Sequence, residues 1–185
     1  MKLEGKVAIV TGGGKGIGEG IARCLAEEGA DIAVVDIDGD NTEKVAAEVK
    51  SMGRKALPVT ADITDEDGVA KIVQQTIDFF GKVDILANNV GGAGGETGRL
   101  MREYRAKLAD ESLPQYMYYS SEVWDEFYKL TLKADVMMSH AVTPHFMKQR
   151  SGKIINTSSI SGRIANPGEM PYASLKAGII SITWK

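Results

Sequence analysis

The sequence has little cysteine and little histidine. Its 185 residues include one cysteine, Cys24, and two histidines, His140 and His145. A single cysteine excludes a disulfide framework within the chain. Two histidines without cysteine or histidine partners at ligand spacing argue against a zinc site, so no metal ligands are assigned. Cys24 stands among apolar residues of an expected helix, where we expect it to be a small core residue.

The chain also lacks an excess of positive charge and a long apolar run. Its formal net charge is −3 and its pI is about 5.5, so nothing indicates a surface for nucleic acid or for a membrane. No apolar stretch reaches the length of a membrane span. The charged start M-K-L-E-G-K does not have the form of a secretory signal. These absences favour a cytoplasmic protein with neither nucleic acid nor membrane as a partner.

The sequence does contain short apolar runs that alternate with stretches of helical period. The runs predict five buried strands, near residues 6–11, 31–36, 55–60, 83–87 and 153–157. Such alternation predicts an α/β fold, a three-layer Rossmann-type doubly wound parallel sheet. The length predicts one domain over residues 1–185. The last helix reaches Lys185 without a cap, which indicates truncation at the C-terminus.

A glycine-rich stretch, T-G-G-G-K-G-I-G at residues 11–18, joins the first strand to the first helix. Glycines permit a tight turn and a close approach to a pyrophosphate, whose charge is favoured at a helix N-terminus. A P-loop is rejected because Lys15 is followed by Gly16, where a P-loop needs Ser or Thr. The alternative is a flexible hairpin loop. The helix after this turn has Ile17, Ile21, Cys24 and Leu25 at helical spacing.

Asp36 ends the second strand, 18 residues after Gly18. This is near the position of the acid that binds the ribose in dinucleotide-binding folds. A carboxylate accepts hydrogen bonds from a ribose diol and repels a 2′-phosphate, so Asp36 favours NAD over NADP. Lys15 argues for NADP instead, because a basic residue can bind a phosphate. The alternative for Asp36 is an acid in an ordinary turn.

A serine, a tyrosine and a lysine lie near the C-terminus, at positions 159, 172 and 176. Tyr172 and Lys176 are four residues apart on an expected helix and therefore share a face. A free tyrosine is a poor base at neutral pH, but a cation held nearby favours the phenolate. Ser159 follows the last strand, where its hydroxyl could hold a substrate oxygen. The alternative is a solvated tyrosine–lysine pair.

Together, T-G-G-G-K-G-I-G, Asp36, A-D-I at 61–63, N-N-V-G at 88–91 and the serine–tyrosine–lysine set resemble the short-chain dehydrogenases/reductases. The resemblance implies a nicotinamide-dependent oxidoreductase that interconverts a secondary alcohol and a ketone, and Asp36 makes NAD the expected cofactor. It makes Tyr172 the general acid/base, Lys176 its activator and a ligand of the nicotinamide ribose, and Ser159 the group that orients the substrate oxygen. It also implies a homodimer or homotetramer. The implied cofactor-binding residues are Gly12, Gly14, Lys15, Gly16, Ile17, Gly18, Asp36, Ile37, Asp62, Ile63, Asn88, Gly91, Tyr172 and Lys176.

One position departs from this family. Its fourth catalytic residue is an asparagine, and alignment on W-D-E-F-Y-K-L-T-L-K places Thr131 there. The family asparagine is thought to hold a water that relays protons to the lysine, and a threonine hydroxyl cannot reproduce an amide. We therefore expect reduced but measurable activity. The rival interpretation is a non-catalytic, nucleotide-binding sensor or scaffold.

Residues 92–121 form an expected insertion after the fourth strand. They predict a wall or lid for a bulky, aromatic or acyl-CoA-type substrate, or alternatively a contact between subunits or a surface elaboration. Ser121 is then expected to cap a helix over residues 122–148, which Pro144 should kink or break.

Overall fold

The computed structural model describes residues 1–91, 99, 103, 106, 119–164 and 169–184. The expected insertion therefore lies almost wholly outside the described residues. The chain groups into two compact units. The first unit comprises Met1–Val90 and Asp135–Ile155, and the second comprises Gly91–Ala134 and Asn156–Lys185. A single domain over the whole chain stays a prediction.

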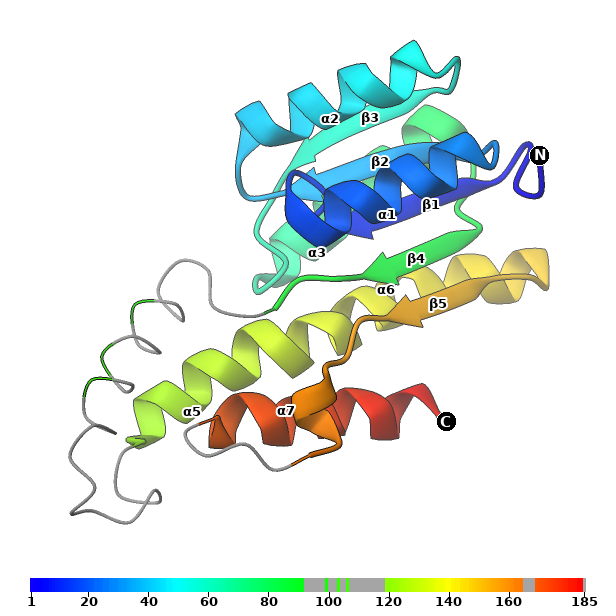
Figure 1. Ribbon diagram of the computed structural model, residues 1–185. Coiled ribbons are helices and arrows are strands. Elements are labelled where there is room, and N and C mark those ends of the chain that lie inside the picture. Colours follow the sequence, from blue (N-terminus) through cyan, green and yellow to red (C-terminus); the bar gives the residue numbers. More distant parts are fainter. Residues whose placement is uncertain (92–98, 100–102, 104–105, 107–118, 165–168, 185) are drawn as a thin grey trace. The chain divides into compact units, whose positions relative to one another are not determined.

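The first unit is built around a five-stranded sheet with the order β3-β2-β1-β4-β5 (Figure 1). The strands are β1 Val7–Thr11, β2 Asp31–Asp36, β3 Ala56–Thr60, β4 Ile85–Asn88 and β5 Lys153–Asn156. β1 pairs in parallel with both β2 and β4, and β2 pairs in parallel with β3. The five expected strands and the Rossmann-type fold are thus confirmed. The strand order reverses between β1 and β4, and this switch point is where such sheets bind ligands.

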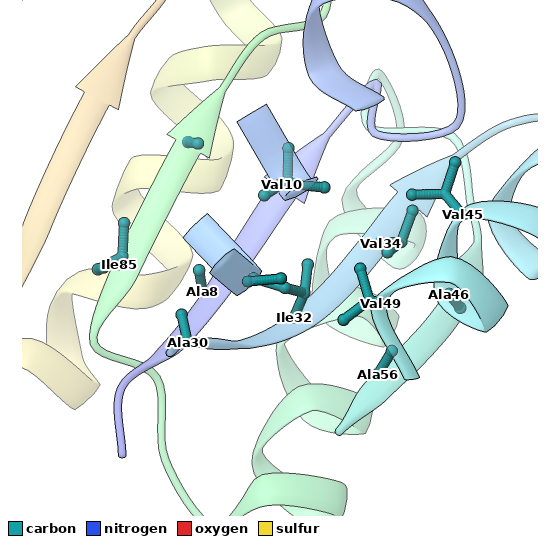
Figure 2. Packing of buried hydrophobic residues seen from close by; sticks show 13 residues of the cluster. Ala8, Val10, Ala30, Ile32, Val34, Val45, Ala46, Val49, Ala56 and Ile85 are labelled. Atoms are coloured by element: carbon teal, nitrogen blue, oxygen red, sulfur yellow. The ribbon is translucent and has the colours of Figure 1, made fainter. Parts of the chain in front are cut away.

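Helices cover both faces of this sheet (Figure 1). They are α1 Gly16–Glu27, α2 Gly39–Ser51, α3 Glu66–Phe80 and α6 Ala134–Gln149. Alternate strand residues such as Val10, Ile32 and Val34 pack against Val45 and Val49 of α2 in one buried cluster (Figure 2). Successive strand residues point to opposite faces. The residues between them, among them Ile9, Val35 and Leu86, are also fully buried, as a sheet covered on both faces requires.

The buried face of α1 differs from the one expected. Its buried residues are Gly18, Ala22 and Ala26, whereas Ile17 is 70% exposed and Cys24 is exposed. The expectation that Cys24 belongs to the core was wrong. Small side chains on the buried face let α1 lie close to the strands, and of the expected stripe only Ile21 and Leu25 pack against the core, both partly buried.

The second unit contains α5 Ser121–Tyr128, the π-helical turn η2 Lys129–Lys133, the 3₁₀ turn η3 Ile160–Gly162 and α7 Met170–Thr183. Its core joins Tyr119, Val123, Phe127 and Leu175. The cap position of α5 is Ser120, without a side-chain hydrogen bond, so the expected cap at Ser121 was wrong.

The expected long helix over 122–148 is confirmed apart from one local change, since α5, η2 and α6 follow one another without a gap from Ser121 to Gln149. The π-turn interrupts it at Lys129–Lys133, and π-turns insert an extra residue into a helix, often at functional sites. Pro144, in contrast, lies inside α6 without ending it. A proline removes one backbone N–H, yet α6 continues past Pro144 to Gln149, so the expected break does not occur.

Candidate active site

The glycine-rich turn after β1 depends on glycine at specific positions. Gly12 and Gly16 have φ angles of +61° and +60°, a region that side-chain-bearing residues rarely adopt. At Gly18 the constraint is steric, because a Cβ there would lie 2.0 Å from the carbonyl oxygen of Gly12. The turn therefore brings its backbone against the start of α1 more closely than any other residue would allow.

The N-terminus of α1 is open to an anion. Lys15 occupies the cap position but forms no side-chain cap hydrogen bond, so no side chain of the cap competes for the first backbone N–H groups of the helix. These groups and the helix dipole favour a phosphate. Exposed Ile17 lies in the same turn. The geometry fits the pyrophosphate of a dinucleotide.

Asp36 is held against the glycine-rich turn. Its side chain is almost buried, at 8% exposure. Oδ2 accepts a hydrogen bond from the Gly14 N–H at 3.1 Å, and Oδ1 accepts one from the Asp38 N–H at 3.2 Å. Each carboxylate oxygen can accept more than one hydrogen bond, so the group can still accept from a ribose diol. Ile37, the next residue, is 71% exposed and offers an apolar surface.

Thr11 links the ends of β1 and β4, a role that sequence reasoning missed. Its buried hydroxyl donates to the Ala87 carbonyl at 3.4 Å and accepts from the Asn89 N–H at 3.0 Å. The only signal in the sequence was its position at the end of a strand, directly before the glycines.

The remaining residues expected near the cofactor have different surroundings. Asn88 is fully buried, and its amide donates to the Asp135 carbonyl at 3.3 Å and to the Ser139 hydroxyl at 3.2 Å. It thereby ties β4 to α6. Asp62 is exposed, and its carboxylate accepts from the Thr64 N–H at 2.8 Å. Ile63 is buried.

Lys176 lies in the second unit with its ammonium withdrawn from solvent. The residue is 2% exposed, and Nζ donates to the Thr157 carbonyl oxygen at 2.6 Å. Gly91, with a φ angle of +140°, leaves room for it, since a Cβ at Gly91 would lie 3.1 Å from Nζ. A buried ammonium is costly unless it is hydrogen-bonded, so these contacts fix where the charge can sit.

Tyr172 and Ser159 belong to the same unit as Lys176. Tyr172 lies one helical turn before Lys176 on α7, with 6.0 Å between the lysine Nζ and the centre of the tyrosine ring. The Ser159 hydroxyl oxygen accepts from the Ser161 N–H at 3.2 Å. Within the described part of the chain, no residue accepts the Ser159 hydroxyl hydrogen or bonds the Tyr172 hydroxyl. Both groups are therefore available to a substrate oxygen.

Thr131, at the position of the family asparagine, lies in the π-turn and is 1% exposed. Its hydroxyl has no hydrogen-bond partner among the residues the structure describes. Its Cγ2 lies 3.8 Å from the point that a Gly91 Cβ would occupy. A buried hydroxyl without a hydrogen-bond partner is unfavourable. A polar group that formed a hydrogen bond with the Thr131 hydroxyl would therefore be stabilised in this turn.

The four expected catalytic residues thus belong to the second unit, whereas all the expected cofactor residues before Gly91 belong to the first. The described residues include no group of three or more acidic, histidine or cysteine side chains that could hold a metal ion. None of the described helices is both long and apolar enough to cross a membrane.

A protein-family model described as short chain dehydrogenase matches residues 6–185, which is nearly the whole chain. A curated relative, the 3-oxoacyl-(acyl-carrier-protein) reductase FabG of Thermotoga maritima, is 32% identical over 183 residues, which are 99% of this chain and 67% of the relative. The enzyme of the same name from Staphylococcus epidermidis is 35% identical over 179 residues, 96% of this chain and 66% of the relative.

Solved structures agree with this match. A 7α-hydroxysteroid dehydrogenase in complex with NADH and 7-oxo glycochenodeoxycholic acid is 31% identical, with a TM-score of 0.81, over 98% of this chain and 64% of that one. An NAD⁺-bound xylitol dehydrogenase is also 31% identical, with a TM-score of 0.84, over 99% of this chain and 64% of that one. The chain thus spans about two thirds of the length of its relatives.

Proposed function

The chain belongs to the short-chain dehydrogenase/reductase family, and on that premise we propose that it is an NAD-dependent oxidoreductase that interconverts a secondary alcohol and a ketone. The observation that carries the proposal is the group formed by Ser159, Tyr172 and Lys176. The hydroxyl hydrogens of Ser159 and Tyr172 have no acceptor among the described residues, and the ammonium of Lys176 is buried. Proton transfer at a substrate oxygen needs such groups.

The chain's residues divide the work of the proposed reaction. A bound nicotinamide supplies or accepts the hydride. During oxidation Ser159 donates a hydrogen bond to the substrate oxygen, and Tyr172 in its phenolate form takes the hydroxyl proton. The carbinol hydrogen leaves with both electrons of its C–H bond as hydride, which a bound nicotinamide would accept, and the O–H electron pair forms the C=O bond. Reduction reverses each step, with Tyr172 as the acid. We assign to Lys176 the role of the positive charge near Tyr172, with 6.0 Å between its Nζ and the centre of the tyrosine ring.

The preference for NAD over NADP is supported by Asp36. A carboxylate held beside the glycine-rich turn by the N–H groups of Gly14 and Asp38 accepts from a ribose diol and repels a 2′-phosphate. The next residue, Ile37, provides no cation for such a phosphate. Exposed Lys15 is the basic group in this turn that would favour NADP instead.

The substrate class is proposed from the relatives. Their names describe a 3-oxoacyl group, a 7-oxo steroid acid and xylitol, which share a carbonyl or a secondary alcohol on a larger carbon framework. We extend this class to the present chain, with an acyl thioester or another bulky ketone as the first candidate. A cytoplasmic homodimer or homotetramer is part of the same proposal.

The test compares Tyr172→Phe with Tyr128→Phe. Tyr128 lies on α5 and is 48% exposed, so its hydroxyl serves as a matched control. Acetoacetyl-CoA, a 7-oxo bile acid and xylitol are supplied with NAD(H) and NADP(H), and the nicotinamide absorbance is followed. Tyr172→Phe should lower turnover by about 10²- to 10⁴-fold and leave NADH binding unchanged. Full turnover by Tyr172→Phe would contradict the proposed role.

A second candidate function is a nucleotide-binding sensor or scaffold without turnover. Thr131 favours this second function, because a threonine stands at the position of the family asparagine. Its hydroxyl has no hydrogen-bond partner among the described residues. NADH binding by the unaltered protein, with no turnover on any of the three substrates, would support this second function.

A further inference from the structure

A short segment between β5 and α7 packs against α7 and makes two hydrogen bonds to one of its residues, Lys176. The carbonyl oxygen of Thr157 accepts from Nζ at 2.6 Å, and the Ser158 hydroxyl donates to the Lys176 carbonyl oxygen at 2.7 Å. Gly162 also lies against the peptide bond that follows Lys176. The segment therefore contacts both the side-chain end and the backbone of the same lysine.

The hydrogen bond from Ser158 is not required to complete α7. Lys176 lies in the middle of this helix, where a carbonyl normally accepts from the N–H four residues later. A carbonyl oxygen has a second lone pair, and Ser158 uses it. The additional bond joins the segment to the helix at the residue whose side chain carries the charge.

Gly162 makes the approach between segment and helix possible. A Cβ at this position would lie 2.8 Å from the Lys176 carbonyl carbon and 2.9 Å from the Ala177 nitrogen, closer than carbon atoms normally come to a backbone. Because its φ angle is not positive, glycine is needed here for space rather than for conformation. This close approach brings the Ser158 hydroxyl within hydrogen-bonding distance of the α7 backbone.

We propose, on the basis of the dehydrogenase function above, that Ser158 is a positioning residue for Lys176. Its hydrogen bond holds the Thr157–Ser158 backbone against α7, so that the Thr157 carbonyl stays where it can accept from the lysine ammonium. Without this bond, the segment and its carbonyl can move away, and the buried ammonium loses its fixed place. Small displacements of a group that supports proton transfer are costly to the rate.

The test uses three variants of the protein. Ser158→Ala removes the hydroxyl, and Ser158→Thr retains a hydroxyl. Ser174→Ala is the matched control, because the Ser174 hydroxyl donates to the Met170 carbonyl at 2.8 Å within the same helix but is exposed. Circular dichroism checks folding. If Ser158→Ala does not fold, Ser158→Cys, a weak donor of similar size, takes its place.

The first measurement does not depend on activity. The protein is treated briefly with acetic anhydride, and acetylation of Lys176 relative to exposed Lys133 is measured by mass spectrometry. Ser158→Ala should raise this ratio at least about fivefold, because local opening exposes the amine. Ser158→Thr and Ser174→Ala should leave it unchanged. An unchanged ratio in Ser158→Ala would overturn the proposal.

The second measurement is steady-state turnover of the substrate that the unaltered protein accepts. Ser158→Ala should lower kcat about tenfold while KM changes less than about twofold, and Ser158→Thr should restore kcat. Equal turnover in Ser158→Ala and the unaltered protein would overturn the catalytic part. If the unaltered protein turns over none of the three substrates, the dehydrogenase proposal fails, and the acetylation ratio still decides whether Ser158 positions Lys176.

Discussion

The carboxylate of Asp36 accepts a hydrogen bond from the backbone N–H of Gly14, with 3.1 Å between Oδ2 and the nitrogen. These two expected cofactor-binding residues belong to different elements, Asp36 to the end of β2 and Gly14 to the glycine-rich turn after β1. The acid that is expected to bind the ribose therefore also fixes the turn that is expected to bind the pyrophosphate. Changes to either residue should affect both tasks.

Gly14→Ala should weaken cofactor binding. A Cβ at Gly14 would lie 3.0 Å from Asp36 Oδ2 and 2.9 Å from the Asn41 Cβ, so the turn and the carboxylate must move apart. We expect the Kd for NADH, measured by fluorescence, to rise at least about tenfold, or about 1.4 kcal/mol.

Gly20→Ala is the control for this substitution. Gly20 lies inside α1, and nothing lies within 4 Å of its Cβ position. Alanine should therefore leave NADH binding unchanged and raise the free energy of unfolding by up to about 1 kcal/mol, because alanine favours helix more than glycine does. Similar Kd values for the two variants would mean that the Asp36–Gly14 contact does not matter for binding.

Asp36→Asn should reduce the discrimination between the two nicotinamide cofactors. The substitution removes the charge that repels a 2′-phosphate, so we expect the ratio of the Kd for NADPH to that for NADH to fall at least about tenfold. Asp40→Asn makes the same charge change at an exposed position of α2 and should leave the ratio unchanged. A lower ratio in both variants would point to overall charge rather than to Asp36.

Thr131→Val should be tolerated, because it removes a buried hydroxyl that has no partner among the described residues. We expect the free energy of unfolding, from urea titration, to stay equal or to rise by about 1 kcal/mol. The control is Thr76→Val in α3, where an equally buried hydroxyl donates to the Ile72 carbonyl at 2.7 Å. That variant should lose about 1 kcal/mol, and equal losses at both positions would show that Thr131 is bonded.

Thr131→Asn restores the residue of the family pattern. We expect turnover to increase, because the family resemblance implies that an amide at this position holds a water for proton relay, which a threonine hydroxyl cannot do. The measurement is kcat at saturating cofactor and substrate. If kcat does not increase, the relay operates in another way in this protein.

Asp84 should make the stability of the first unit dependent on pH. Burial raises the pKa of its carboxyl, but hydrogen bonds from Lys82, the Val7 N–H and Lys6 outweigh burial and lower the pKa below its ordinary value. A carboxyl with a lowered folded-state pKa stabilises the fold at pH values above its unfolded pKa, about 3.9. This stabilisation is lost as the pH falls through the folded-state pKa.

The measurement compares Asp84→Asn with the unaltered protein by urea unfolding at pH 7 and at pH 3. We expect a loss of about 2 kcal/mol at pH 7, since hydrogen bonds to a charged group are the stronger ones. At pH 3 the loss should be smaller. Asp78→Asn, at an exposed position of α3, is the control and should show a small effect at both values. A loss at Asp84 that does not change with pH would contradict the prediction.

Part of this protein was determined by its sequence alone. The apolar runs predicted five strands and their alternation with helices, because a buried parallel strand needs continuous apolar residues. The glycine turn, the acid at the end of β2 and the tyrosine–lysine spacing were visible as well, because each depends on residues close together in the chain.

Other features were decided by the tertiary structure. Cys24 points to solvent because the close packing of α1 on the sheet selects Gly18, Ala22 and Ala26 for the buried face. The π-turn around Thr131 and the contact of Ser158 with Lys176 arise between residues that local periodicity does not connect. Local sequence sets which backbone conformations are available, but the choice of face and of partner depends on packing against segments distant in the chain.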